Sequence, residues 1–320
     1  MLTTFENAVA AIEKGTLLHI SGTEALLRDL PRGNWIGGST EYFLDESGGK
    51  TTGELLDVRE LPFSDYKFAA YDVDALPGIT KDAYANGFSI IILPFDSAVH
   101  KAYAQDATGY EDIFLTPVVG WISGLNLDKS GQTPVAVNGQ SGEITADKAI
   151  VLHIGVPEDK TVLLNIINIF SVDESSPEIT FSTDGFSVDT CFVDGKETVL
   201  ADYIAQHSID TKLPLVGSYG GAGVNVSIKA IADGTVSLYA PVFSGITYKF
   251  AEPIEDYEAA FNSSIAQIDN KSSAFACNCI LNYLYGALEG KDAGGFYGPI
   301  TFGEIAWQLL NQTLVYLQII

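Results

Sequence analysis

The first 125 residues alternate between helical and strand patterns, and this alternation constrains the fold more than any other feature. Helices are expected near residues 3–14, 79–86 and 96–105, and the apolar stretches "TLLHIS" and "FSIIILPF" between them are expected to be strands. Strands separated by helices form layered structures in which some neighbouring strands run parallel. The N-terminal part is therefore predicted to be an α/β layer.

The middle of the chain carries a different pattern. Short alternating segments between residues 134 and 250 are separated by turn signals, of which "VDGKE" and "ADGTV" are the clearest. Asp-Gly readily adopts the positive φ that tight hairpins need, so these segments predict antiparallel sheet. The last part returns to helices and strands, with a helix expected at 255–268, a strand at 272–280, a helix at 281–290 and a final strand at 312–320.

These patterns predict an α/β (α+β) fold of two α/β halves with mixed sheets and a largely antiparallel central section. A polar stretch, "LNLDKSGQTP", suggests the division into residues 1–128 and 129–320. A chain of 320 residues is long enough for two domains or for two halves of one.

The charge balance restricts the partners. The chain has 41 acidic and 17 basic residues, a net charge of −24. A field of this sign repels phosphate, so nucleic acid is not expected as a partner. The longest apolar runs fall far short of the ~20 residues that cross a membrane, and the start lacks a secretory signal. With only three cysteines, we expect a cytoplasmic protein without a membrane partner.

No metal or cofactor is expected. The four histidines are scattered, and no pair has metal-ligand spacing. The stretch "DESGGKTTG" resembles part of a phosphate-binding loop, but such a loop needs a glycine where Leu44 stands. A polar hairpin turn is the better interpretation.

A first candidate ligand site is "NWIGGSTEYF". Here a predicted strand ends in Gly37 and Gly38, followed by Ser39 and Thr40. Ligands of α/β sheets favour the carboxyl ends of strands. The alternative is an ordinary glycine-rich turn.

A second candidate site is "GGFYGPITFGEIAWQLLNQT" near the C-terminus. Thr301 and Glu304 fit a capping box, which predicts a short helix at 301–311 with the Glu304 carboxylate on the backbone N–H of Thr301. Glu304 could also bind a ligand amine. Asn311 and Gln312 would supply amide groups. The aromatic side chains suited to the walls of such a pocket are Phe296, Tyr297, Phe302 and Trp307.

Cys277 and Asn278 precede this segment at the end of a predicted strand. Cys277 could act as a nucleophile with Glu304 or a histidine as its partner, or it could be a small buried residue.

The C-terminal stretch resembles the FIST family of ligand-sensing domains. The matching features are Cys277 in "FACNCILNYL", the pairs Gly295-Phe296 and Gly303-Glu304, and the triplet Asn311-Gln312-Thr313 before the last strand. The resemblance is strongest over the last fifty residues, and "NWIGGSTEYF" is similar to an early turn of that family. It implies that both candidate segments share one ligand pocket.

Three functions follow as hypotheses. The favoured one is a sensory protein of intracellular signal transduction that binds a small polar ligand, such as an amino acid, and signals to a separate protein. The second is a hydrolase or transferase that uses Cys277. The third is a non-catalytic scaffold, for which a homo-oligomer would form the working surface. Enzymatic activity is the less favoured expectation because no triad or cofactor loop is visible.

Overall fold

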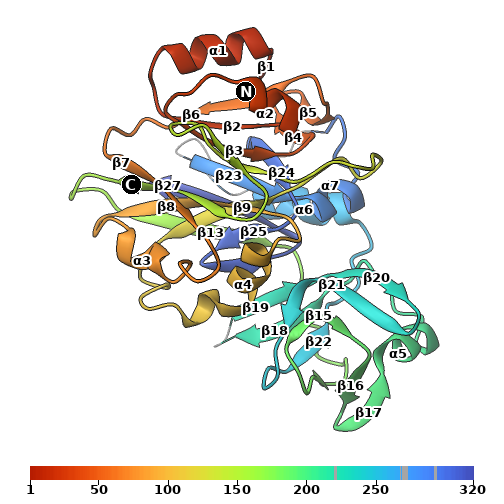
Figure 1. Cartoon of the computed structure of the whole chain (residues 1–320). Helices are drawn as coiled ribbons and strands as arrows, with labels where there is room; N and C mark the ends of the chain where they lie inside the picture. Colours follow the sequence, from red (N-terminus) through yellow and green to blue (C-terminus); the bar gives the residue numbers. More distant parts are fainter. Residues whose placement is uncertain (220–221, 267, 269–272, 292–293) are drawn as a thin grey trace.

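The chain folds into a layered α+β body from which a smaller β-rich lobe projects (Figure 1). The computed structural model describes residues 1–219, 222–266, 268, 273–291 and 294–320. The α+β class with several mixed sheets is as predicted.

Three six-stranded sheets make up the body. The N-terminal sheet has the order β1 (Leu2–Thr3), β6 (Leu56–Glu60), β2 (Leu18–Gly22), β3 (Trp35–Ser39), β10 (Ala136–Asn138), β11 (Glu143–Thr145). The central sheet has the order β26 (Gln308–Leu310), β25 (Glu304–Ala306), β9 (Val118–Ser123), β8 (Gly87–Pro94), β12 (Ala149–Gly155), β7 (Tyr66–Tyr71). The C-terminal sheet has the order β13 (Val162–Asn168), β27 (Thr313–Ile319), β23 (Ser273–Cys279), β24 (Gly298–Thr301), β4 (Tyr42–Asp45), β5 (Gly48–Thr51).

Two antiparallel sheets form the lobe, residues 173–251. Their orders are β17 (Lys196–Val199), β16 (Thr190–Val193), β14 (Ile179–Thr180), β22 (Tyr248–Phe250), β18 (Leu215–Tyr219), β19 (Ala222–Val226), and β15 (Gly185–Val188), β21 (Thr235–Val242), β20 (Ile228–Ala232). The helices of the described residues are α1 (Phe5–Glu13), α2 (Glu24–Asp29), α3 (Gly78–Asp82), α4 (Ala98–Asp106), α5 (Leu200–Gln206), α6 (Tyr257–Ile265) and α7 (Ile280–Tyr285), with a 3-10 turn at Ala107–Gly109.

Parallel pairing occurs where the sequence alternates between helix and strand. β2 pairs parallel with β3, and β8 with β9. β23 and β24 form a third parallel pair, in the C-terminal sheet. Three helices begin at capping residues: Thr4, Thr23 and Ser97 each accept a hydrogen bond from the backbone N–H three residues later.

The apolar stretch at β8 is buried on both faces, which explains its lack of polar alternation. Ile90 and Ile92 point into the core beneath the N-terminal sheet. Ile91 and Leu93 point into the larger core that reaches the lobe. β8 is therefore the shared wall between two cores.

The predicted hairpins lie in the lobe. Asp194 and Gly195 join β16 to β17, and Asp233 and Gly234 join β20 to β21. All four residues have positive φ, between 46° and 83°, as Asp-Gly turns require. The antiparallel central section is thus confirmed.

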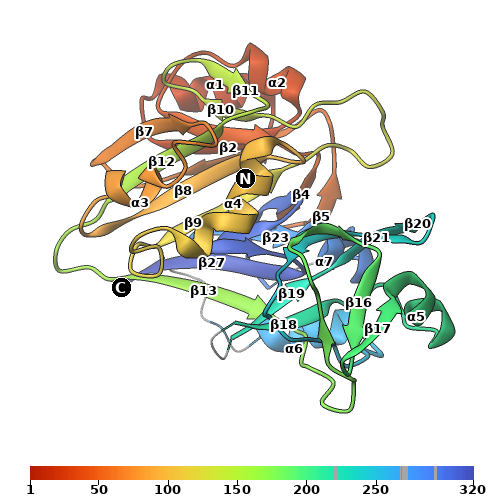
Figure 2. The same cartoon turned by 60° about the horizontal axis from the view of Figure 1, so that its bottom comes forward.

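The chain passes between the body and the lobe at a neck of two adjacent segments, and the lobe also packs on the body through the larger core. Val172 and Ala251 form an antiparallel bridge, flanked by hydrogen bonds from Asp173 N to Phe250 O at 3.1 Å and from Glu252 N to Ser171 O at 2.9 Å. The chain therefore enters and leaves the lobe side by side, and Figure 2 shows the lobe beside α6 and α7.

The proposed division at residue 128 falls in the loop between β9 and β10. Strands from both sides of it share every sheet of the body: β10 pairs with β3, β12 with β8, β25 with β9, and β24 with β4. The two segments are therefore interleaved in the body.

The predicted helix at 301–311 is wrong. This segment forms β24, β25 and β26, because β25 pairs with β9 across the central sheet. Trp307 and Gln312 have φ of 63° and 52°, which breaks the segment into short strands. The helix predicted at 281–290 is shorter than expected and ends at Tyr285.

Candidate functional site

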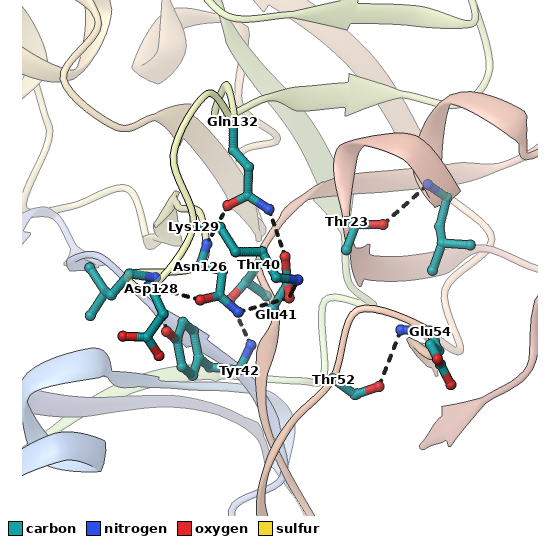
Figure 3. A network of polar contacts seen from close by, with 12 residues as sticks. Thr23, Thr40, Glu41, Tyr42, Thr52, Glu54, Asn126, Asp128, Lys129 and Gln132 are labelled. Carbon is teal, nitrogen blue, oxygen red and sulfur yellow. Dashed lines mark hydrogen bonds and ion pairs between the residues drawn. The ribbon is translucent and has the colours of Figure 1, made fainter.

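Glu41 is a buried carboxylate between β3 and β4, with an exposed fraction of only 2%. Lys129 Nζ and Asn126 Nδ2 donate to its Oε2 at 2.7 and 2.9 Å, and Gln132 Nε2 donates to Oε1 at 2.7 Å (Figure 3). All three donors come from the loop that follows β9. One short loop therefore supplies the hydrogen bonds that hold Glu41.

The loop orients these donors through its own backbone. The N–H of Asn126 donates to Gln132 Oε1 at 2.7 Å, and the N–H of Asp128 donates to Asn126 Oδ1 at 2.9 Å. Each amide oxygen is thereby occupied, which turns the two NH₂ groups toward Glu41. The N–H of Leu127 donates to the hydroxyl of Tyr42 at 3.0 Å and anchors the loop.

Glu41 is ionised at neutral pH. Burial alone would raise the pKa of this carboxyl, but the hydrogen bonds from Lys129, Asn126 and Gln132 outweigh burial and hold the pKa below its usual value. A carboxylate oxygen can accept two hydrogen bonds, and Oε1 accepts only the one from Gln132 among the described residues. Glu41 therefore retains a place for one further donor.

A cavity of about 190 Å³ opens beside Glu41. Its walls come from the carboxyl ends of β2, β3 and β9, where the parallel pairs of two sheets meet, which is the position that ligands favour in α/β sheets. The lining includes Thr23, Glu24, Ser39, Thr40, Glu41, Gly124, Gln132 and Thr133. This hollow, called the Glu41 pocket below, contains two of the residues predicted from "NWIGGSTEYF".

Ser39 and Thr40 hold the pocket walls together. Ser39 Oγ donates to Gly124 O at 2.8 Å and accepts from the N–H of Val135 at 2.9 Å. Thr40 Oγ1 donates to Ile300 O at 2.8 Å. Thr40 thus links the N-terminal candidate segment to the C-terminal one, although both hydroxyls have already donated their protons.

Gly37 and Gly38 serve close packing. A Cβ on Gly38 would lie 2.7 Å from Ile92 Cγ2 and 3.0 Å from the ring of Trp121, so the missing side chain lets the N-terminal sheet lie against the central sheet. A Cβ on Gly37 would lie 2.3 Å from Ile20 O. Neither glycine lines the Glu41 pocket.

Glu304 lies on β25 with no exposed surface. Its Oε1 lies 2.8 Å from Thr301 Oγ1, and its Oε2 accepts from the hydroxyl and N–H of Thr313 at 2.9 and 3.3 Å. The predicted capping contact with the backbone N–H of Thr301 is therefore wrong, and side-chain contacts between strands replace it.

Burial sets the protonation of Glu304 against its hydrogen bonds. Thr301 Oγ1 lies within donor distance of both Asn278 O, at 3.2 Å, and Glu304 Oε1. Burial raises the pKa of Glu304 to about 8, although the hydrogen bonds from Thr301 and Thr313 act in the opposite direction.

A buried polar network links Glu304 to the surface. Asn282 Nδ2 donates to Asn278 Oδ1 at 2.8 Å and to Thr313 O at 3.1 Å. Tyr257 OH donates to Asn282 Oδ1 at 2.6 Å, and Gln312 Nε2 lies 3.5 Å from the same hydroxyl. The structure thus brings Asn278, Thr301, Glu304 and Gln312 together in one buried network, with Tyr257 at the outer end.

The other predicted residues of the C-terminal candidate site do not contribute side chains to this network. Asn311 Nδ2 donates to Leu310 O at 3.0 Å, and Phe296 packs against Tyr316 with ring centroids 4.8 Å apart. Tyr297 lines a separate cavity of about 210 Å³ together with His19. Phe296 and Tyr297 therefore do not form walls around Glu304.

Cys277 is buried in β23, where its thiol lies 3.4 Å from Gly120 O. Burial and then the nearby Glu304 raise the pKa of this thiol well above its usual value. A thiolate nucleophile needs the opposite shift. The geometry thus gives no support to a nucleophilic role for Cys277.

A family model for proteins of unknown function, DUF6976, matches residues 3–320. The chain belongs to the DUF6976 family. No curated protein matches this DUF6976 chain. The family match does not test the FIST resemblance, which stays a prediction.

Sequence reasoning missed the central residue of the Glu41 pocket in this DUF6976 chain. Glu41 follows Ser39 and Thr40 directly, and an acid between polar and aromatic residues in "STEYF" was the available signal. Its partners Asn126, Lys129 and Gln132 lie in the stretch interpreted as a boundary. No group of three potential metal ligands occurs in the described parts of the chain, and no helix there is long and apolar enough to cross a membrane.

Proposed function

We propose that the protein binds a small ligand bearing an amine or ammonium group in the Glu41 pocket. The observation that carries the proposal is a buried, ionised carboxylate that lies beside a cavity and has one oxygen short of a donor. A pocket of about 190 Å³ lies below the roughly 300–1,000 Å³ typical of drug-sized ligands, so the ligand is small.

Ligand binding in this pocket would affect the loop that follows β9. Lys129 is half exposed and binds Oε2, so a ligand ammonium bound at the open place of Oε1 would compete with it for the charge of Glu41. A released Lys129 would change the surface that this loop presents. We therefore propose a cytoplasmic sensory role in which a separate signalling protein reads that loop, as the FIST resemblance implies.

Thermal unfolding in the presence of small amines, amino acids and polyols tests this function. A ligand at 100 times its Kd stabilises the folded state by about 2.7 kcal/mol. We expect an amine or amino acid to raise the Tm and polyols to have a smaller effect, because they carry no positive charge. Absence of any shift across the panel would contradict the proposal.

The variant Glu41→Gln keeps the side-chain size and removes the charge. We expect amine binding to weaken at least about tenfold, since a charge-assisted hydrogen bond is lost. Glu143→Gln is the matched control. Glu143 pairs with Lys148 outside the pocket, and this substitution removes one negative charge, as Glu41→Gln does. Equal weakening in both variants would show a general charge effect and refute the site.

A further inference from the structure

A larger hollow lies where the lobe meets α6 and α7. Its volume is about 500 Å³, and its lining combines three aromatic rings with charged side chains. The lining residues are Phe170, Asp210, Lys212, Leu213, Ile254, Glu255, Asp256, Tyr257, Glu258, Tyr285, Gly286, Ala287 and Lys291. We call this hollow the lobe cleft.

The three rings of the lobe cleft meet edge to face. Phe170 and Tyr257 have centroids 5.9 Å apart at an angle of 68°, and Tyr257 and Tyr285 have centroids 6.3 Å apart at 78°. The hydroxyl of Tyr257 is held from below by Asn282 and Gln312, which fixes the orientation of the central ring. The rings therefore form a preorganised aromatic wall.

This wall already holds a cation from the protein itself. Lys212 Nζ lies 5.5 Å from the centroid of the Tyr285 ring, within the range of a cation–π contact. The backbone of Lys212 is fixed, because its N–H bonds to Asp210 Oδ1 and its carbonyl accepts from Gln312. The Lys212 side chain, in contrast, has no ion pair among the described residues.

The rim of the lobe cleft is acidic. Four carboxylates, Asp210, Glu255, Asp256 and Glu258, line it against the two lysines. Lys291 is already paired with Glu258, and no lysine or arginine of the described residues forms an ion pair with Asp210, Glu255 or Asp256. A cation is thus favoured by both the ring faces and the rim, whereas an anion would be repelled.

We propose that the lobe cleft binds an organic ammonium cation on the face of Tyr285, where the ligand takes the place of the Lys212 ammonium. This site is independent of the Glu41 pocket. The ring face attracts charge without needing an N–H donor, so the lobe cleft can accept a quaternary ammonium. The Glu41 pocket, in contrast, requires a donor for the Glu41 carboxylate.

Calorimetric titration with tetramethylammonium chloride tests the proposal, with sodium chloride as the salt control. This probe has no N–H group to donate to Glu41, so Glu41→Gln should bind it as tightly as the wild type if the response comes from the lobe cleft. We expect saturable binding to the wild type, at least tenfold weaker binding to Tyr285→Leu, and retained binding to Tyr285→Phe, which keeps a ring.

The most discriminating variant is Lys212→Met, which keeps the chain length and removes the internal competitor. We expect it to bind tetramethylammonium several-fold more tightly than the wild type. Lys229→Met is the matched control, because Lys229 Nζ lies over the ring of Phe95 at 4.9 Å, outside the cleft; its affinity should equal that of the wild type. The proposal would be overturned if Lys212→Met bound tetramethylammonium more weakly than the wild type, or if neither Lys212→Met nor the wild type bound it.

Discussion

A single buried carboxyl shows how far residue identity alone determines its role. The sequence placed Glu304 in a capping box, and its nearness to Thr301 is real. The contact nevertheless joins side chains on consecutive strands of two different sheets. The motif describes spacing only, and strand pairing decides the backbone conformation. Glu41 is the opposite case. No local motif marks it, because its three partners lie about 90 residues away in the chain.

At the same scale, Glu304 should make stability depend on pH. Its folded pKa of about 8 exceeds the ordinary value of 4.5, so between these values the folded state holds a proton that the unfolded state has released. Stability therefore falls as the pH rises through this window. Glu304→Gln cannot ionise, so it avoids the loss of stability that the wild type suffers as the pH rises, and we expect it to be more stable than the wild type at pH 8 by an amount on the order of a few kcal/mol.

Urea unfolding of both proteins at pH 5, 6, 7 and 8 measures this difference. The difference in the free energy of unfolding between Glu304→Gln and the wild type should increase with pH and be smallest at pH 5. Glu143→Gln serves as the control, because Glu143 lies in a partly exposed ion pair. A gap for Glu304→Gln that stays constant with pH would show that this carboxyl does not carry a raised pKa.

At the scale of elements, the sequence predicted those whose signals are local. The helices expected near residues 3–14 and 96–105 are α1 and α4, and the hairpins expected from Asp-Gly are present, because these signals span only a few residues. The helix at 301–311 failed because its alternative, pairing of β25 with β9, involves residues about 180 positions apart. Asn278 and Gln312 were predicted to lie in one candidate ligand site. Both side chains are buried, and this burial depends on how the sheets pack, which the sequence pattern does not state.

The hairpin of β4 and β5 offers an element-scale prediction. The segment "DESGGKTTG" forms the expected hairpin, and Gly49 docks on the chain after α7: its N–H donates to Lys291 O at 3.0 Å, and the N–H of Gly290 donates to Gly49 O at 2.8 Å. A Cβ on Gly49 would lie 2.3 Å from Leu288 O. We expect Gly49→Ala to lower the free energy of unfolding by about 1–3 kcal/mol.

Gly109→Ala is the matched comparison in the same denaturation experiment. No atom lies within 4 Å of a Cβ built on Gly109, and its backbone does not need positive φ. Its stability should therefore stay near that of the wild type. Equal stability of the Gly49 and Gly109 variants would mean that the hairpin does not dock as described.

At the scale of the whole molecule, the periodicity of the sequence predicted the fold class. It did not predict how the strands of the two halves combine into shared sheets. Periodicity identifies strands without naming their partners, and the body interleaves strands from both sides of residue 128. The β24–β4 and β25–β9 pairs, for example, tie the C-terminal segment to the N-terminal one. Such long-range pairing is set by the packing of whole sheets.

This interleaving predicts how fragments behave. Residues 1–128 and 129–320, produced separately, should each lack a cooperative unfolding transition, because β3, β8 and β9 lose their partners. Produced together, they should associate into a complex with a native-like circular dichroism spectrum. A fragment 1–128 that unfolds cooperatively by itself would contradict this prediction and support two autonomous halves.

The neck at Val172 and Ala251 has a consequence for how the length of the chain can vary. β13 precedes the lobe while β23 and β27 follow it, so the C-terminal sheet is completed only when the two ends of the lobe are brought together. The entropy lost in closing such a loop grows only with the logarithm of its length, by about 0.6 kcal/mol for each doubling. The turns of the lobe that lie away from the shared core, such as the one between β16 and β17, are therefore where the chain can lengthen at the least cost to the body.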